Sequence, residues 1–328
     1  GDDNTAIGNN SLYALTTGNN NAALGSYSLH ALTTASQNTA VGKNALYALT
    51  SANDNTAIGY NALGANTTGA QNTAIGKDAL DANTTAHDNT AVGVGALGVN
   101  TTGASNVAIG NYALDANTTT SYNTAVGYSA LGANTGDDNT ACGYYALQVN
   151  TTGANNTAIG VGALDANTTA DDNTACGLNA LGANTTGSSN TGLGRDAGLY
   201  ITTGSNNTML GKSSGTNSSP SGSITTGSNV ICLGNNSVTD LYCADTSISS
   251  SDARDKTDVE DFKYGLSWIT ELRPVTYRWD RRSWYTDDDN TKGTPDGSKK
   301  GSRIHVGFLA QEAIEVEKRF GYGDKKDN

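Results

Sequence analysis

The sequence predicts an all-β solenoid, a parallel β-roll or β-helix of 17-residue coils, followed by a small α+β domain. Three observations lead to this prediction. A short motif recurs through most of the 328 residues, bulky apolar side chains are rare, and the composition changes abruptly after Ser250. A period this short cannot hold a pair of helices but fits one β-coil. We therefore expect a thin, repetitive shaft and a separate end domain.

The repeat has a core of Asn-Thr-Ala-aliphatic-Gly. Its asparagines lie at positions 4, 21, 38, 55, 72, 89, 106, 123, 139, 156, 173, 190 and 207, with a divergent copy at Asn229. The position number rises by 17 from copy to copy, except for a step of 16 into Asn139 and a step of 22 into Asn229. Because each repeat is one coil, we expect the shorter step to be absorbed in the turn around Gly136 without loss of register.

Each repeat is expected to hold two short strands. The first ends in an aliphatic residue, and a glycine follows it where the chain must turn tightly. These aliphatic positions are Ile7, Leu24, Val41, Ile58, Ile75, Val92, Ile109, Val126, Cys142, Ile159, Cys176, Leu193 and Leu210. The second strand is expected to carry Leu12, Leu29, Leu46, Leu63, Leu80, Leu97, Leu114, Leu131, Leu147, Leu164 and Leu181.

Stacked coils should align asparagines in two columns, one beginning at Asn4 and the other at Asn66, whose side-chain amides bond along the stack. The alanines of the motif, from Ala6 and Ala23 onward, form a small-residue face that we expect to pack against another chain. Because a coil this thin buries little surface by itself, the solenoid is expected to form a homotrimer.

Cysteine, charge and hydropathy exclude several classes of protein. Cys142 and Cys176 replace aliphatic residues two repeats apart, so we expect small core residues rather than a disulfide. Residues 1–245 carry 4 Lys and Arg against 15 Asp and Glu, whereas residues 246–328 carry 15 against 16. An acidic shaft repels phosphate backbones, so no nucleic-acid partner is expected. No stretch approaches the roughly 20 apolar residues of a membrane-spanning helix, so no membrane insertion is expected.

The sequence also predicts no metal and no cofactor. His30, His87 and His305 are scattered, and no carboxylates or cysteines accompany them at ligand spacing. No phosphate-binding loop or nucleotide-binding fingerprint is present.

The composition after Ser250 is that of an ordinary mixed domain. Residues 262–272 place apolar side chains at helical spacing and end before Pro274. Residues 275–279 and 304–308 are expected strands around an exposed polar arm at 287–302, and a second helix should begin at Ala310. We therefore predict a shaft at 1–236, a connector at 237–250 and an end domain at 251–328.

Four motifs of the end domain occur in a recognisable order. They are Ser251-Asp252-x-Arg254-x-Lys256, Tyr264-Gly265-Leu266, Leu272-Arg273-Pro274-Val275-x-Tyr277-Arg278-Trp279 and His305-Val306-Gly307-Phe308-Leu309-Ala310-Gln311-Glu312. Over residues 251–320 the sequence resembles the intramolecular chaperone auto-processing domain, peptidase family S74, of phage tailspikes, endosialidases and fibres. Over residues 1–211 the motif also resembles the head repeat of trimeric autotransporter adhesins, a left-handed parallel β-roll.

The resemblance implies a domain that trimerises, guides folding of the shaft and then cuts itself away. It makes Ser251 the nucleophile, Lys256 its activating partner and the Ser250–Ser251 bond the cleavage site. It also implies closing helices after Asn328. A serine hydroxyl becomes reactive when a neighbour takes its proton, and a desolvated lysine can do so. The enzyme activity expected is therefore at most a single-turnover autoproteolysis.

These features favour a trimeric viral tail fibre or tailspike, located on the virion and acting in attachment to a host receptor or glycan. The alternative is a bacterial cell-surface trimeric adhesin that retains its chaperone domain. A carbohydrate-degrading tailspike would need paired carboxylates in a groove, and the repeat offers no such pair.

Overall fold

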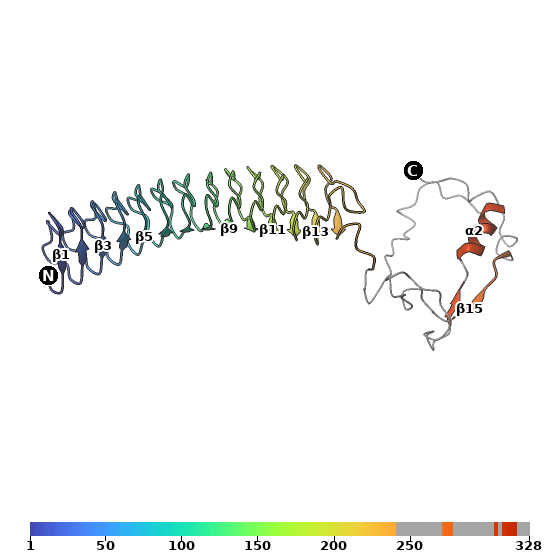
Figure 1. The fold of residues 1–328 in the computed structure, drawn as a ribbon, viewed down its shortest axis with the longest axis horizontal. Helices are drawn as coiled ribbons and strands as arrows, with labels where there is room; N and C mark the ends of the chain where they lie inside the picture. The colour runs from blue at the N-terminus through green and yellow to red at the C-terminus, as the bar shows by residue number, and fades with distance from the viewer. Residues whose placement is uncertain (241–270, 278–304, 308–309, 320–328) are drawn as a thin grey trace, which may run out of the picture. The chain divides into compact units, whose positions relative to one another are not determined.

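The computed structural model describes residues 1–240, 271–277, 305–307 and 310–319. Contacts divide the chain into two compact units, Gly1–Tyr242 and Cys243–Asn328. The first unit is a parallel β-solenoid, in which every coil adds one three-residue strand to a single 14-stranded sheet whose order follows the chain (Figure 1). The strands are β1 Thr5–Ile7, β2 Ala22–Leu24, β3 Thr39–Val41, β4 Thr56–Ile58, β5 Thr73–Ile75, β6 Thr90–Val92, β7 Val107–Ile109, β8 Thr124–Val126, β9 Thr140–Cys142, β10 Thr157–Ile159, β11 Thr174–Cys176, β12 Thr191–Leu193, β13 Thr208–Leu210 and β14 Ile231–Leu233.

The register follows the repeat through the shortened coil, as predicted. Strand β8 pairs with β9 through Thr124 and Thr140, although this step is one residue shorter than the others. The predicted alignment of the last repeat is wrong. Strand β13 pairs Thr208 with Ile231, so Val230 and not Asn229 takes the place of the motif asparagine. The Val230 backbone N–H donates to Asn207 Oδ1 at 2.9 Å.

Both predicted asparagine columns are present. In the first, Asn72 Nδ2 donates to Asn55 Oδ1 of the preceding coil at 3.3 Å and to the Ala86 carbonyl at 2.8 Å. The Asn72 Oδ1 atom accepts the Asn89 backbone N–H at 3.0 Å. In the second column, Asn83 Nδ2 donates to Asn66 Oδ1 at 3.1 Å. Because these side chains are fully buried, each amide must be paired inside the stack, and this requirement holds neighbouring coils in register.

The predicted second strand is wrong, because the leucines lie in a turn. Leu80 has φ of 51° and follows Ala79, and both side chains are fully buried. A strand sends consecutive side chains to opposite faces, so it could not bury both. A left-handed leucine costs about 1–2 kcal/mol, whereas complete burial of its side chain contributes about 1.5–3 kcal/mol. Burial therefore offsets the strain in each coil that has a fully buried leucine at this position.

The predicted inner and outer faces of the strand are also reversed. In the interior strands the central alanine, such as Ala74, is fully buried against the leucines of the same solenoid and is not free for another chain. The aliphatic residue after it points outward. Cys142 and Cys176 occupy this outward position and are exposed free thiols, not core residues. The reason is space, because a leucine inside so narrow a coil leaves room opposite for little more than a methyl group.

The outward residues form one column along the sheet, which we name the aliphatic column. Its members are Ile7, Leu24, Val41, Ile58, Ile75, Val92, Ile109, Val126, Cys142, Ile159, Cys176, Leu193, Leu210 and Leu233. Ten of them are exposed, and Val41, Val92, Val126 and Leu210 are half-buried.

The tight turn predicted after each strand is confirmed. Gly76 has φ of 140°, a conformation that L-residues rarely adopt. A Cβ atom on Gly76 would lie 2.4 Å from the Gly93 carbonyl oxygen of the next coil. Both the dihedral angle and the close approach of the next coil therefore require glycine there.

The described part of the second unit contains two strands and one helix. Strands β15 (Val275–Tyr277) and β16 (His305–Gly307) pair antiparallel, with Thr276 opposite Val306. Helix α2 (Ala310–Arg319) follows, with acidic Glu312 in its first turn and Lys318 and Arg319 in its last turn. This charge order complements the helix macrodipole. The two predicted strands and the second helix are thus confirmed, while the predicted helix at 262–272, apart from its last two residues, and the polar arm at 287–302 lie outside the described residues.

Candidate functional site

The predicted cleavage residues Ser250, Ser251 and Lys256 lie outside the described residues. The site is therefore built from the segments of the same unit that the structure does describe, residues 271–277 and helix α2. Both segments belong to the motifs singled out in the sequence.

An ion pair joins these two segments. Arg273 lies just before Pro274 and β15, and Glu312 lies in the first turn of α2. Arg273 Nε donates to Glu312 Oε2 at 3.1 Å, and Arg273 Nη2 donates to Glu312 Oε1 at 2.5 Å. A guanidinium matches a carboxylate with two parallel hydrogen bonds, which fixes orientation as well as distance. Two residues that are distant in sequence are thus held in one geometry.

A second ion pair lies near the other end of α2. Arg319 Nη1 is 2.6 Å from Glu271 Oε2, and between the two pairs the Val316 side chain is buried. An open depression of about 420 Å³ is lined by Glu271, Arg273, Glu312, Glu315, Val316 and Arg319. Two ion pairs, Arg273–Glu312 and Arg319–Glu271, therefore link the helix to residues 271–273.

The electrostatics of the first pair favour the charged forms of both partners. The hydrogen bonds from Arg273 hold the pKa of the Glu312 carboxyl below its ordinary value of 4.5. The same contact raises the pKa of Arg273. A carboxylate with a lowered pKa is a poor general base near neutral pH. The cluster therefore suits a structural clamp rather than proton transfer.

The turns of the shaft also carry open depressions. One of about 260 Å³ is lined by Asp165, Asn179 and Tyr200 among others, and a second of about 260 Å³ contains Asp115 and Tyr112. A third of about 220 Å³ contains Asp196. Each has only one carboxylate, so none of these three has the pair that glycoside hydrolysis requires.

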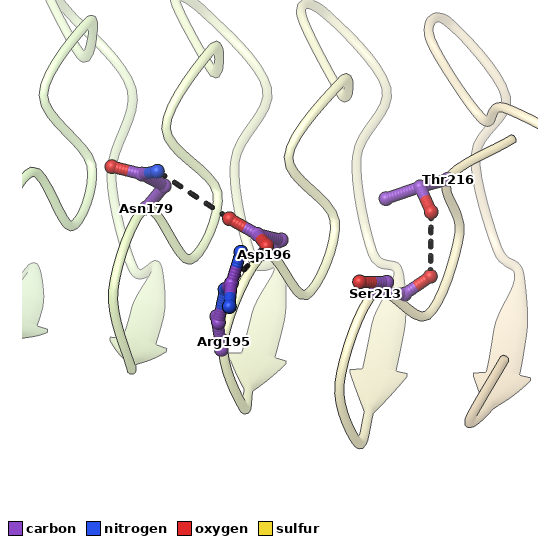
Figure 2. Close-up of polar contacts among 5 residues, drawn as sticks. All are labelled: Asn179, Arg195, Asp196, Ser213 and Thr216. Atoms are coloured by element: carbon purple, nitrogen blue, oxygen red, sulfur yellow. Dashed lines mark hydrogen bonds and ion pairs between the residues drawn. The ribbon is translucent and has the colours of Figure 1, made fainter. Parts of the chain in front are cut away.

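Figure 2 shows how the third depression is ordered. Asn179 Nδ2 donates to Asp196 Oδ1 at 3.4 Å, and Arg195 Nε donates to Asp196 Oδ2 at 2.9 Å. In the next coil, Thr216 Oγ1 donates to the Ser213 carbonyl at 2.7 Å. Both Asp196 oxygens are engaged by neighbouring side chains, which leaves this carboxylate little capacity for a reaction.

Within the part of the chain that the structure describes, no group of three His, Cys, Asp or Glu residues could hold a metal ion. No described helix is long and apolar enough to cross a membrane.

Comparison with known proteins identifies the second unit. Residues 251–322 match the family model Peptidase_S74, described as chaperone of endosialidase. The C-terminal segment is a peptidase S74 chaperone domain. A parallel β-solenoid of 17-residue coils precedes it. No curated protein and no solved structure matches the chain.

The S74 match begins at Ser251 and includes Arg273 and Glu312. Such chaperone domains are typical of phage tail fibres and endosialidases and work in trimeric fibres. The sequence motifs contain both clamp residues, but nothing in their spacing pairs them. The sequence did place Arg273 just before a predicted strand and Glu312 near the start of a predicted helix, and these two positions were the available sign of an ion pair.

Proposed function

We propose that the chain is the shaft of a trimeric phage tail fibre or tailspike that acts in host attachment. Its S74 domain, in this proposal, brings three chains together, guides folding of the solenoid and then cuts the Ser250–Ser251 bond. The observation that carries the proposal is the S74 match placed directly after a long in-register solenoid.

The physical need for such a chaperone is clear from the shaft. Fourteen similar coils can pair in many shifted registers, because most of them offer nearly the same residues to a neighbour. Parallel pairing of this kind also forms slowly. A domain that aligns three chains at one end would set the register before the coils propagate.

The proposed cleavage needs only residues of the chain and water. Lys256 Nζ takes the proton from Ser251 Oγ, and the oxygen attacks the Ser250 carbonyl carbon. The C–N bond breaks as the amine of Ser251 takes a proton, which leaves an ester between Ser250 and the Ser251 oxygen. Water then hydrolyses the ester to the Ser250 carboxylate and the free hydroxyl. Proximity within one chain supplies the rate advantage that substrate binding gives an ordinary protease.

The test is expression of the full chain and its Ser251→Ala and Lys256→Ala variants. The wild-type chain should yield two fragments, the second beginning at Ser251 by mass spectrometry. Either variant should slow cleavage by about 100-fold or more, because it removes the nucleophile or its base. Ser249→Ala and Lys263→Ala are matched controls that should cleave normally.

An intact wild-type chain after native folding would contradict self-cleavage and would favour the alternative, a bacterial surface adhesin with a retained chaperone. That alternative is supported by the likeness of the coil motif to adhesin head repeats. Equal cleavage in the Ser251→Ala variant would instead contradict the assignment of the nucleophile.

A further inference from the structure

The aliphatic column is the largest regular feature of the shaft that the fold itself does not use. Its side chains stand on the outer face of the sheet, one coil above the next, with the buried alanines behind them. The solenoid core is complete without them, because alanine, leucine and asparagine already fill each coil. Fourteen aligned and partly exposed apolar side chains need a separate explanation.

Comparison of the repeats with one another shows that this position is restricted. All fourteen copies are Ile, Leu, Val or Cys. A second outward position, two residues further on, has drifted freely: it holds Asn9, Ser26, Lys43, Tyr60, Lys77, Val94, Asn111, Tyr128, Tyr144, Val161, Leu178, Arg195 and Lys212. If the column were exposed to water in the assembled protein, nothing in the fold would require apolar residues there, since the outward position two residues further on varies between polar, charged and apolar residues.

The fourteen strands that carry the column are also free of charge. None of the fourteen strands contains Asp, Glu, Lys or Arg, although residues 1–245 carry 15 acidic and 4 basic side chains. All charges of the shaft therefore lie outside the strands. Two copies of an acidic rod repel each other less where such uncharged strands face each other.

The dimensions of the strip suit a second copy of the same chain. Fourteen strands at about 4.8 Å spacing give a length of roughly 60 Å, and a stable interface needs about 800 Å² from each partner. A width of roughly 13 Å supplies this area. In each strand the outward threonine and the outward aliphatic residue lie about 7 Å apart. The threonine column and the aliphatic column, with the widths of their side chains, therefore span roughly the 13 Å required. Only a partner with the same pitch can match every coil, and another copy has that pitch.

We infer that the aliphatic column is the face on which three copies of this chain pack, about a threefold axis parallel to the stack. Coils of the same number then meet at the same height, and Ile75 of one chain contacts Ile75 of the others. The inference rests on the proposed trimeric fibre and specifies which surface assembles it. It replaces the alanine face, which is buried inside each coil.

The first experiment compares two double variants of the full chain by sedimentation or light scattering. In Ile75→Asp with Ile159→Asp, the column receives two carboxylates at residues that are 37% and 44% exposed. In Val94→Asp with Val161→Asp, the same change falls on residues that are 38% and 48% exposed but lie off the column. The column variant should dissociate at a concentration at least roughly 100-fold higher than wild type, because it buries unpaired charges, while the control should remain assembled.

The second experiment uses the natural thiols and does not depend on how well a charged variant folds. Cys142 and Cys176 are exposed members of the column, and threefold packing in register brings each beside its own copies. Diamide, which takes up the two electrons and two protons of two thiols, should give covalently linked chains in wild type. With Cys243 replaced by serine in every chain compared, the Cys142→Ser with Cys176→Ser variant should not link, and Val161→Cys added to that background should not restore linking.

The outcomes separate this inference from the proposed function. A wild-type trimer that survives the column substitutions and does not link through Cys142 or Cys176 would refute the aliphatic interface and leave the trimeric fibre standing. A wild-type chain that remains a monomer would refute both. Equal dissociation of the two aspartate variants, without thiol linking, would show that charge alone and not the column decides assembly.

Discussion

The two units of this protein hold their chain segments together by different means. In the shaft, buried asparagines such as Asn72 bond from coil to coil, and the side chains between them are alanine and leucine. In the described part of the S74 domain, exposed ion pairs such as Arg273–Glu312 join segments that are distant in sequence. Neutral amides in a closed stack specify register, whereas charged pairs at a surface specify which segments meet.

This difference fits the proposed roles, in which the S74 domain starts assembly and the shaft continues it coil by coil. Every interior coil of the shaft offers the same contacts above and below, so a correct first pairing is copied along the stack. The S74 domain has no such repetition, and its contacts are made once. Substitutions in the two units should therefore differ in size and in their dependence on pH.

The largest effect is expected at a turn glycine of the shaft. Gly110 has φ of 135°, and a Cβ atom there would lie 2.3 Å from the Gly127 carbonyl oxygen. Gly110→Ala should destabilise the solenoid by about 2–6 kcal/mol, because it adds dihedral strain to a steric clash. Denaturant unfolding followed by circular dichroism would measure this.

Gly95→Asn is the matched control for that substitution. Gly95 has φ of 65°, and the equivalent positions of other coils hold Asn61 and Asp78 at similar angles. This change should alter stability by less than about 1 kcal/mol. Similar losses at Gly95 and Gly110 would show that the conformation, and not the contact with the next coil, imposes glycine.

A somewhat smaller loss is expected when one asparagine column is interrupted. Asn106 Oδ1 accepts the Asn123 backbone N–H at 3.0 Å, and Asn106 Nδ2 donates to the Thr120 carbonyl at 2.9 Å. Asn106→Ala leaves buried groups without partners and should cost about 2–4 kcal/mol. Asn111→Ala removes one exposed bond to Val94 and should cost less than half as much. Equal losses in the two variants would mean that the column does not hold the stack.

The smallest effect is an opposite pH dependence of the two units. Burial raises the pKa of Asp81 above 3.8, with a further contribution from Asp78, and burial also raises the pKa of Asp115 and Asp165. The folded shaft therefore binds these protons more tightly than the unfolded chain. Its stability should increase as pH falls toward 3.8 and decrease as pH rises through the raised values. For Glu312, whose pKa is lowered, the contribution is present above 4.5 and is lost as pH falls through the lowered value.

Thermal unfolding of the full chain at several pH values, followed by the circular dichroism of the solenoid, would test this dependence. The triple variant Asp81→Asn, Asp115→Asn, Asp165→Asn should lose the increase at acid pH. The control Asp54→Asn, Asp88→Asn, Asp172→Asn removes the same total charge from exposed turn positions and should keep it. If the two triple variants follow the same curve, general charge repulsion accounts for the dependence and burial does not.

Much of the shaft could be predicted from the repeat because stacked coils translate sequence period directly into strand register. The regular step, the shortened coil at Asn139, both asparagine columns and the turn glycines follow from this rule. The last repeat was misaligned because its inserted residues and the loss of the motif asparagine at Val230 leave no periodic signal there. The cleavage pair Ser251 and Lys256 stays a prediction from family resemblance.

By itself the sequence determined the period, the register and the presence of a chaperone domain after the shaft, because these depend only on the order of residues. The tertiary structure decided which apolar residues face inward. Ala74 and Ile75 alternate in one strand, and both are apolar, so the pattern cannot say which of them is inside. That choice depends on the space that the buried Leu80 side chain leaves inside the coil. Leu80 has a left-handed backbone conformation, which leucine by itself disfavours, so its inward direction could not be predicted from local preference. Because leucine fills the narrow interior, alanine lies opposite it and the isoleucines are left on the outer face.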